Sequence, residues 1–267
     1  MFLLNLQKHL IKAGAFALKN WLITRNRGFH VFEILFWPFI GLISVGLLTQ
    51  FLGLEPRTTQ FILIGVIALN VVQVAQLDMA YVVLYGIWNR SLRNEMVAPI
   101  GVFHLAAGSW AMGVIHALLI LLLMSSFSAV AFHVRFWEIG LIPLLLLFGG
   151  LLFFAASIGM MVCGLAFRFG GRAHVGAASI VSILILLSGI YYPVEILPEP
   201  ARAISFFIPL TYFLEYFRSF YGFIPQHQAP LLIGFLLVLA YNMAGIWFLS
   251  SSVSNARAKG TLTQLFE

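Results

Sequence analysis

Apolar residues run along most of the chain in long blocks, and short polar segments separate the blocks. An α-helix needs about 20 predominantly apolar residues to cross a bilayer. Six blocks are close to that length or exceed it. They lie at residues 32–52 and 61–87, within 102–132 and 139–167, and at 175–192 and 231–251. The pattern therefore predicts an all-α integral membrane protein with six transmembrane helices.

The first 23 residues follow a different pattern. If residues 3–23 form a helix, Lys8, Lys12 and Lys19 fall on one face and apolar residues fall on the opposite face. A helix with these two faces is typical of one that lies in the membrane interface. We therefore expect an N-terminal amphipathic interfacial helix before the first span.

The stretch between the fifth and sixth spans, residues 193–230, is too apolar for an ordinary loop. Pro209 divides it into two helical pieces, at about 201–208 and 211–221. A seventh span here would leave backbone groups at the break unpaired in lipid, and would move the basic C-terminal tail outside. We expect instead a re-entrant helical hairpin that dips into the outer leaflet.

The basic residues give the orientation of the spans. Eleven of the 15 lysines and arginines lie on the side of the two termini, and four lie on the other side. The positive-inside rule places both termini in the cytoplasm. The chain is then one domain, with an interfacial helix at 1–28, six spans within 29–251, an extracellular hairpin at 193–229 and a cytoplasmic tail at 252–267.

Composition agrees with a membrane protein. Hydrophobic residues make up 61% of the chain and charged residues 9%, whereas soluble domains carry about 25% charged residues. The net charge of +6 comes from residues spread among membrane-flanking segments, which favours contact with anionic lipids and not with nucleic acid. Cys163 is the single cysteine, so an internal disulfide is excluded.

No motif predicts catalysis by this chain. The sequence has no H-E-x-x-H, no aspartate-rich cluster and no C-x-x-C, so we expect no metal site. It also has no G-x-x-x-x-G-K-[ST], so any ATP that drives transport must bind another chain. The histidines are scattered. His116 lies alone in the third span, and we interpret it as a packing or hydrogen-bonding residue.

The second span is the most polar of the six. Asn70, Gln73 and Gln76 share an arc of roughly 120° on a helical wheel, and Asp78 lies about 140° from the middle of that arc. In one interpretation, the amides line a translocation route and Asp78 bonds another helix. In the other, all four residues make hydrogen bonds between helices.

The loop after the second span, W-N-R-S-L-R-N-E-M-V-A-P at residues 88–99, is charged. Leu92 and Met96 are spaced to share one helical face. A short amphipathic helix on the cytoplasmic side is a docking element for a soluble partner. Glu33, at the start of the first span, is interpreted as a structural ion-pair partner of Arg25, Arg27 or Arg90.

Aromatic residues crowd the hairpin and its flanks. They are Tyr191, Tyr192, Phe206, Phe207, Tyr212, Phe213, Tyr216, Phe217 and Tyr221. An aromatic belt at the membrane interface is one explanation. Stacking against a passing sugar or lipid is the other.

Two segments near the hairpin carry a resemblance to a known family. They are S-G-I-Y-Y-P-V-E-I-L-P-E at residues 188–199 and I-P-L-T-Y-F-L-E-Y-F-R at 208–218. They belong to a chain that begins with a basic helix and continues with six predicted spans. A charged loop follows the second span. In this order of features, the whole chain resembles the permease subunit of type-two ABC exporters, a group that exports drugs, polysaccharides and glycolipids.

The resemblance implies a homodimer of this chain with two cytoplasmic ABC ATPase subunits, which hold ATP and Mg²⁺. It also implies a multi-pass protein of the inner (plasma) membrane that exports an amphiphilic, glycan or drug-like substrate. The coupling helix that seats in the ATPase would comprise Arg90, Ser91, Leu92, Arg93, Asn94, Glu95 and Met96. The outer gate would include Tyr191, Tyr192, Pro193, Phe206 and Tyr212. An ATP-independent secondary transporter or channel is the alternative.

Overall fold

The computed structural model describes the backbone of residues 2–26, 28–97 and 101–258. Within these ranges it describes all side chains except those of residues 2–10, 23–24, 26, 28–31, 33, 93 and 96–97. The described chain is helical and contains no strand. Its α-helices are α1 (Phe2–Asn26), α2 (Gly28–Phe51), α3 (Pro56–Trp88), α4 (Leu92–Val97), α5 (Val102–Phe132), α6 (Leu141–Phe169), α7 (Ala173–Leu187), α8 (Glu199–Ser205), α9 (Pro209–Ser219) and α10 (Pro230–Ala258). Three 3₁₀ turns join them: η1 (Phe136–Ile139), η2 (Gly170–Arg172) and η3 (Val194–Ile196).

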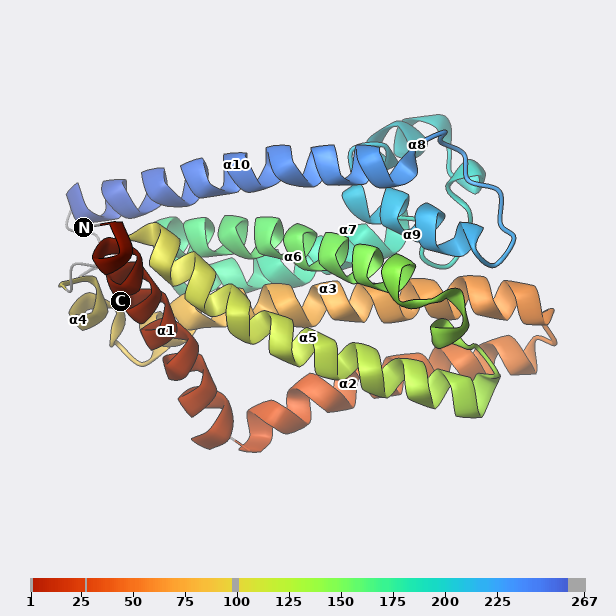
Figure 1. Ribbon diagram of the computed structural model, residues 1–267, viewed down its shortest axis with the longest axis horizontal. Helices are drawn as coiled ribbons and strands as arrows, with labels where there is room; N and C mark the ends of the chain where they lie inside the picture. Colours follow the sequence, from red (N-terminus) through yellow and green to blue (C-terminus); the bar gives the residue numbers. More distant parts are fainter. Residues whose placement is uncertain (1, 27, 98–100, 259–267) are drawn as a thin grey trace.

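The long helices form an elongated bundle with α3 at its centre (Figure 1). Helix α3 packs against α5 on one side and α6 on the other, and α10 packs against α6. Helix α1 crosses one end of the bundle against α5, and α4 lies at that same end. Helices α8 and α9 lie at the opposite end, so the bundle has an α4 end and a hairpin end.

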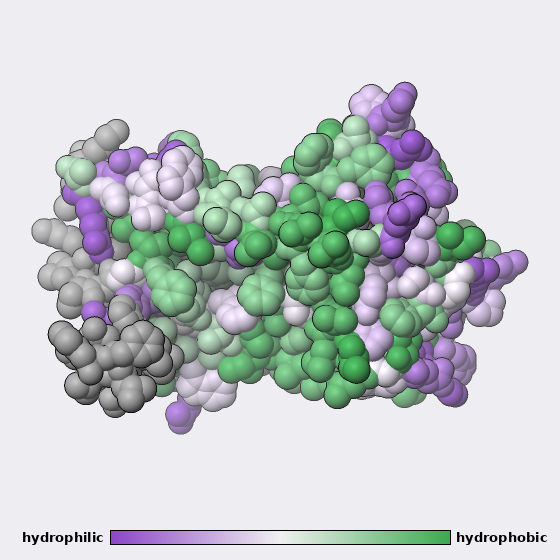
Figure 2. Space-filling view, turned by 45° about the horizontal axis from the view of Figure 1, so that its top comes forward, coloured by the Kyte–Doolittle hydropathy of each residue, from purple (hydrophilic) through white to green (hydrophobic). Residues whose placement is uncertain are grey.

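The central helix α3 is more buried than α2 and α10. In its most apolar 18-residue segment, 72% of the residues are buried inside the protein, compared with 22% for α2 and 17% for α10. The middle of the face in Figure 2 is hydrophobic, and hydrophilic residues gather at both ends. An apolar band between polar ends is the surface that a bilayer solvates.

Five helical stretches of the described chain are long and apolar enough to cross a membrane. The fourth stretch, Leu141–Leu187, contains both α6 and α7. The prediction of a helical, multi-pass protein is confirmed. The predictions of six spans, an interfacial α1 and a re-entrant hairpin are placements relative to a bilayer, and they stay predictions.

The predicted end of the fifth span was wrong by five residues. Helix α7 ends at Leu187 and not at position 192. The chain turns at Gly189, whose φ of +69° is strained for any residue with a side chain, and Pro193 follows. The apolar residues after Leu187 therefore belong to a turn, which hydrophobicity alone does not distinguish from helix.

The break at Pro209 was predicted correctly. Pro209 is at the start of α9, where its missing N–H costs no helical hydrogen bond. Helix α8 ends at Ser205, and a short turn joins it to α9. The amide of Ile208 donates a hydrogen bond to the carbonyl of Ser205 in this turn.

Candidate functional site

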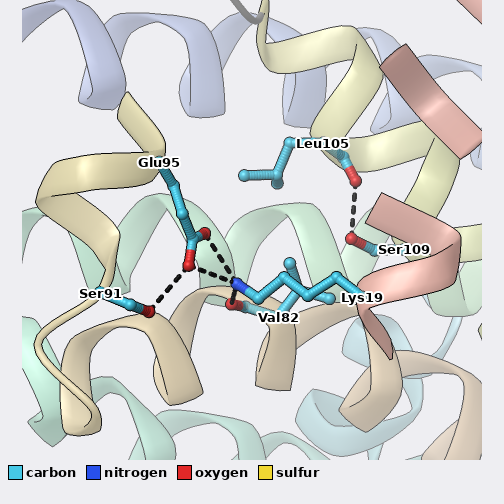
Figure 3. A network of polar contacts seen from close by, with 6 residues as sticks. All are labelled: Lys19, Val82, Ser91, Glu95, Leu105 and Ser109. Atoms are coloured by element: carbon cyan, nitrogen blue, oxygen red, sulfur yellow. Dashed lines mark hydrogen bonds and ion pairs between the residues drawn. The ribbon is translucent and has the colours of Figure 1, made fainter. Parts of the chain in front are cut away.

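At the α4 end, an ion pair joins two helices that are far apart in the sequence (Figure 3). The Nζ of Lys19 in α1 lies 2.7 Å from both carboxylate oxygens of Glu95 in α4. The same Nζ donates to the carbonyl of Val82 in α3 at 3.3 Å, and Ser91 Oγ donates to Glu95 at 2.8 Å. Both charged side chains are largely buried, with 25% and 20% exposed. We call Lys19, Glu95, Ser91 and the Val82 carbonyl the α1–α4 clamp.

The clamp adds a contact that the sequence pattern of α1 does not show. Lys19 was predicted to share a charged face with Lys8 and Lys12, and its ammonium group is directed toward α4. The side chain of Lys8 lies outside the described residues. Helix α1 reaches this position because Gly108 of α5 lets the α1 backbone approach closely. A Cβ on Gly108 would overlap the Ala13 carbonyl.

The short helix α4 lies where the amphipathic helix was expected. However, Leu92 is only 1% exposed and packs against Gly86 of α3, so it fixes α4 to the bundle and is not free for a partner. Arg90 and Asn94 are exposed. Arg90 ends the turn after α3 with a φ of +57°, and its amide donates to the Ile87 carbonyl.

The side chains of Arg93 and Met96, both assigned to the coupling segment, lie outside the described residues. So does the side chain of Glu33, with its expected ion pair.

The amides of α3 are mostly turned inward. Asn70 Nδ2 donates to the Val66 carbonyl of its own helix at 2.8 Å. Gln76 is 1% exposed, and its Nε2 lies 3.5 Å from the Ala177 carbonyl of α7. Gln73 is half-buried. In the single chain, Asn70 and Gln76 therefore sit in the protein interior and do not face an open passage.

Asp78 bonds another helix, as one sequence interpretation held. Its Oδ2 lies 2.6 Å from His116 Nδ1 of α5, and both side chains are buried. The sequence analysis treated these two residues separately. The available signal was that each is an ionisable residue in an apolar span, and such residues usually pair with one another.

At the hairpin end, Arg218 of α9 ties three segments together. Its Nη1 donates to the Gly189 carbonyl at 2.7 Å, and its Nη2 donates to the carbonyls of Phe61 at 2.7 Å and Ile190 at 2.9 Å. The guanidinium also lies over the Phe61 ring, 3.4 Å from its centroid. From the sequence, Arg218 was recognisable as one of the four basic residues on the outer side and as the last residue of the 208–218 segment, and these contacts were not predicted.

Burial lowers the pKa of Arg218 to about 9, and the nearby Glu215 carboxylate opposes this shift. The guanidinium is therefore still charged at neutral pH. Gly65 of α3 makes the contact possible, because a Cβ there would overlap the Ile190 carbonyl and lie 2.7 Å from Arg218 Nη2.

The predicted gate residues lie around the hairpin but do not form one cluster. Tyr192 donates its hydroxyl to the Leu186 carbonyl at 2.6 Å. Tyr212 is buried, and its hydroxyl donates to the Phe206 carbonyl at 2.8 Å, which closes the α8–α9 turn. Burial raises the pKa of Tyr212. Tyr191 is half-buried and Pro193 is exposed.

Two cavities of about 480 Å³ flank the hairpin. One is apolar and lies among α6, α7, α10 and the α8–α9 turn, with Phe154, Ile183, Phe207 and Phe248 in its wall. The other is polar. We call it the hairpin cavity, and its wall includes Arg57, Ser188, Glu195, Thr211, Glu215 and Arg218. Among the described residues, no group of three His, Cys, Asp or Glu side chains is placed to hold a metal ion.

The sequence model of the ABC-2 type transporter family matches residues 22–222, which include α4, α8 and α9. The chain belongs to the ABC-2 type transporter family. It is therefore a multi-pass membrane transport permease, a transport subunit and not an enzyme, of a family that typically pairs with an ATPase subunit.

The chain is also similar to two other proteins. The inner membrane transport permease YadH of Escherichia coli K12 is 25% identical over 187 residues, which are 69% of this chain and 70% of that protein. An uncharacterized protein of Archaeoglobus fulgidus is 49% identical over 51 residues, which are 19% of this chain and 80% of that protein.

Proposed function

We propose that the chain is the permease subunit of an ATP-driven exporter in the inner (plasma) membrane. Two copies of it would assemble with two cytoplasmic ABC ATPase subunits, which bind ATP and Mg²⁺. Helices α2, α3, α5, α6, α7 and α10 would be the six spans, with residues 1–28 at the interface, 193–229 outside and 252–267 in the cytoplasm. The substrate would be an amphiphilic, glycan or drug-like molecule that leaves the cytoplasm.

The length of α7 supports a re-entrant hairpin. Its 15 residues are about 22 Å long, whereas the hydrocarbon core is about 30 Å thick. Helix α8 packs against α7, so α8 and α9 would fill the remaining depth of the outer leaflet. Ile204 and Phe207 are more than half exposed at the hairpin, as contact with lipid requires.

The single observation that carries the proposal is the α1–α4 clamp. A coupling helix must transmit the motion of the ATPases to the membrane helices. The clamp joins α4 to α1 through Lys19 and Glu95, and Leu92 holds α4 against α3. A push on α4 would therefore move α1 and the cytoplasmic end of α3 together.

Arg90, in the turn before α4, and Asn94, in α4, are exposed, and these residues would contact the ATPase. The proposed translocation route lies between the two copies. Gln73 is the amide residue of α3 whose side chain is partly exposed in the single chain, so it would face this route. Gln76 would reach the route only if α3 and α7 move apart, and Asn70 only if the protein that buries it moves away. The proposed outer gate is the hairpin with Tyr191, Tyr192, Pro193, Phe206 and Tyr212.

A charge reversal at Arg90 tests the coupling role. Arg90→Glu is expected to lower transport and ATP hydrolysis by the complex, whereas Arg90→Lys keeps the charge and most of the activity. Arg172→Glu is the matched control, because Arg172 is an exposed arginine of η2 near the same end. Equal transport by the Arg90→Glu and Arg172→Glu variants would remove this segment from the mechanism.

A further inference from the structure

The hairpin cavity has the features of a ligand-binding site that faces the side opposite α4. It lies among α3, the turn after α7, and α9. Arg57 and Glu195 are exposed, whereas Ser188 and Arg218 are 1% and 4% exposed, so the cavity extends from the surface into the protein. Its volume of about 480 Å³ is within the usual range of small-molecule pockets, about 300–1,000 Å³.

Unsatisfied hydrogen-bonding groups are concentrated around this cavity. Five buried side-chain atoms of the described residues have no hydrogen-bond partner, and three of them belong to residues of the cavity wall. They are Ser188 Oγ, Glu215 Oε1 and Arg218 Nε. Buried polar groups are almost always hydrogen-bonded, because an unpaired group costs free energy. Three such groups around one cavity therefore indicate a polar occupant.

The available atoms define the chemistry of that occupant. The two buried charged side chains already make hydrogen bonds within the protein. Arg218 donates from Nη1 and Nη2 to backbone carbonyls, and Glu215 Oε2 pairs with His227 Nδ1 at 3.0 Å. What remains is Nε–H and the second N–H of Nη1 on Arg218, one carboxylate acceptor on Glu215 and the Ser188 hydroxyl, which can both donate and accept.

A ligand with several hydroxyl groups satisfies this set, since each hydroxyl both donates and accepts. A phosphate group fits it poorly. Arginine holds phosphate best through two parallel N–H groups. Each such pair on a guanidinium includes an N–H of the same terminal nitrogen, and in Arg218 both N–H groups of that nitrogen, Nη2, are bonded to the carbonyls of Phe61 and Ile190. The wall also has equal numbers of acidic and basic side chains, Arg57 and Arg218 against Glu195 and Glu215, so it favours a neutral ligand. Phe61 and Phe223 line the cavity and supply apolar surface for a sugar ring.

We propose that the hairpin cavity binds a neutral polyhydroxylated ligand, such as a sugar residue, through Ser188, Glu215 and Arg218. The ligand would bridge the turn after α7 and α9. The inference rests on the groups of this cavity and holds whether or not the chain works with an ATPase.

Ser188→Ala gives the sharpest test. The Ser188 hydroxyl has no partner in the protein, so its removal breaks no internal hydrogen bond. The matched control is Ser128→Ala, because Ser128 Oγ is also buried without a partner and belongs to α5, away from the cavity wall. The full chain is placed in phosphatidylcholine nanodiscs free of glycoside detergents. Binding of glucose, N-acetylglucosamine and inositol is measured by saturation-transfer NMR, with inorganic phosphate and phosphoethanolamine as comparison probes.

We expect saturable binding of at least one of the three polyols to the wild type. Ser188→Ala should weaken it by about three- to tenfold, the loss of one hydrogen bond, and Ser128→Ala should leave it unchanged. No polyol binding would overturn the proposal, because water alone would then satisfy the cavity. Preferential binding of phosphate or phosphoethanolamine, or equal effects of the two serine variants, would also overturn it.

Discussion

Lys19 of α1 and Glu95 of α4 are 76 positions apart in the sequence, and their charged groups lie 2.7 Å apart. The clamp predicts that Lys19→Met lowers transport without weakening ATPase binding, because the exposed residues Arg90 and Asn94 are unchanged. A partly buried pair of this kind contributes on the order of 1 kcal/mol. The measurement is transport in proteoliposomes together with ATPase retention on an affinity column.

A charge swap separates the ion pair from the individual side chains. Lys19→Glu combined with Glu95→Lys should recover part of the transport that each single variant loses. Arg25→Gln is the matched control on the same helix, since Arg25 is exposed, and it should behave as the wild type. If the swap recovers nothing and Lys19→Met binds less ATPase, the pair serves docking and not transmission.

We expect a large loss of stability when the guanidinium group of Arg218 is replaced. Arg218→Lys has one nitrogen in place of the fork and leaves some of the carbonyls of Phe61, Gly189 and Ile190 without a donor. Each unsatisfied buried group costs about 1–3 kcal/mol, so a clear drop in melting temperature is expected by intrinsic tryptophan fluorescence. Arg202→Lys on exposed α8 should leave the melting temperature unchanged. Equal melting temperatures for the two variants would contradict the assigned role.

Gly65 is a position where we expect even a substitution by alanine to lower the stability of the protein. A Cβ at Gly65 would overlap the Ile190 backbone and crowd Arg218 Nη2, so Gly65→Ala should destabilise the hairpin end. Gly149→Ala in α6 is the control, because a Cβ there meets no atom within 4 Å. The control should be neutral or more stable by up to about 1 kcal/mol. A Gly65→Ala protein as stable as the wild type would show that α3 and the turn after α7 do not pack as described.

We expect a large loss of stability when one partner of the Asp78–His116 pair is removed, and a small loss of stability when both are removed. His116→Leu leaves a buried carboxylate without its imidazole, at a cost of about 3–5 kcal/mol. Asp78→Leu with His116→Leu removes both partners, and replacement of a buried pair by apolar residues is often close to neutral. Thermal unfolding of the wild type and of these two variants measures the difference. A stable double variant that no longer transports would show that the pair has a functional role beyond packing.

The long helices were predictable because lipid demands long apolar helices, and the positions of α3, α5 and α6 follow the apolar blocks closely. The end of α7 was not predictable from hydrophobicity. The turn after α7 depends on the backbone conformation of Gly189 and on hydrogen bonds from Arg218 to two carbonyls of that turn. A pattern of apolar residues shows neither the conformation nor the hydrogen bonds.

The candidate site was predictable only in part, for the same reason. The helix at α4 follows from local spacing, but the inward direction of Leu92 depends on Gly86 of a neighbouring helix. The pairing of Lys19 with Glu95 brings together residues from separate segments, and only the tertiary fold decides such a contact. Asp78 and His116 were recognisable as unusual residues, yet their distance is a property of how α3 and α5 pack.

The most direct test of the proposed function is whether an ATPase accompanies the chain. The full-length, affinity-tagged protein is purified from its native membranes in a mild detergent, and its partners and ATP hydrolysis are measured. We expect a cytoplasmic ABC ATPase in equal amount, with ATP hydrolysis that Arg90→Glu reduces and Arg172→Glu does not. A transport-competent chain that purifies without an ATPase and hydrolyses no ATP would contradict the proposal, and would favour an ATP-independent transporter or channel.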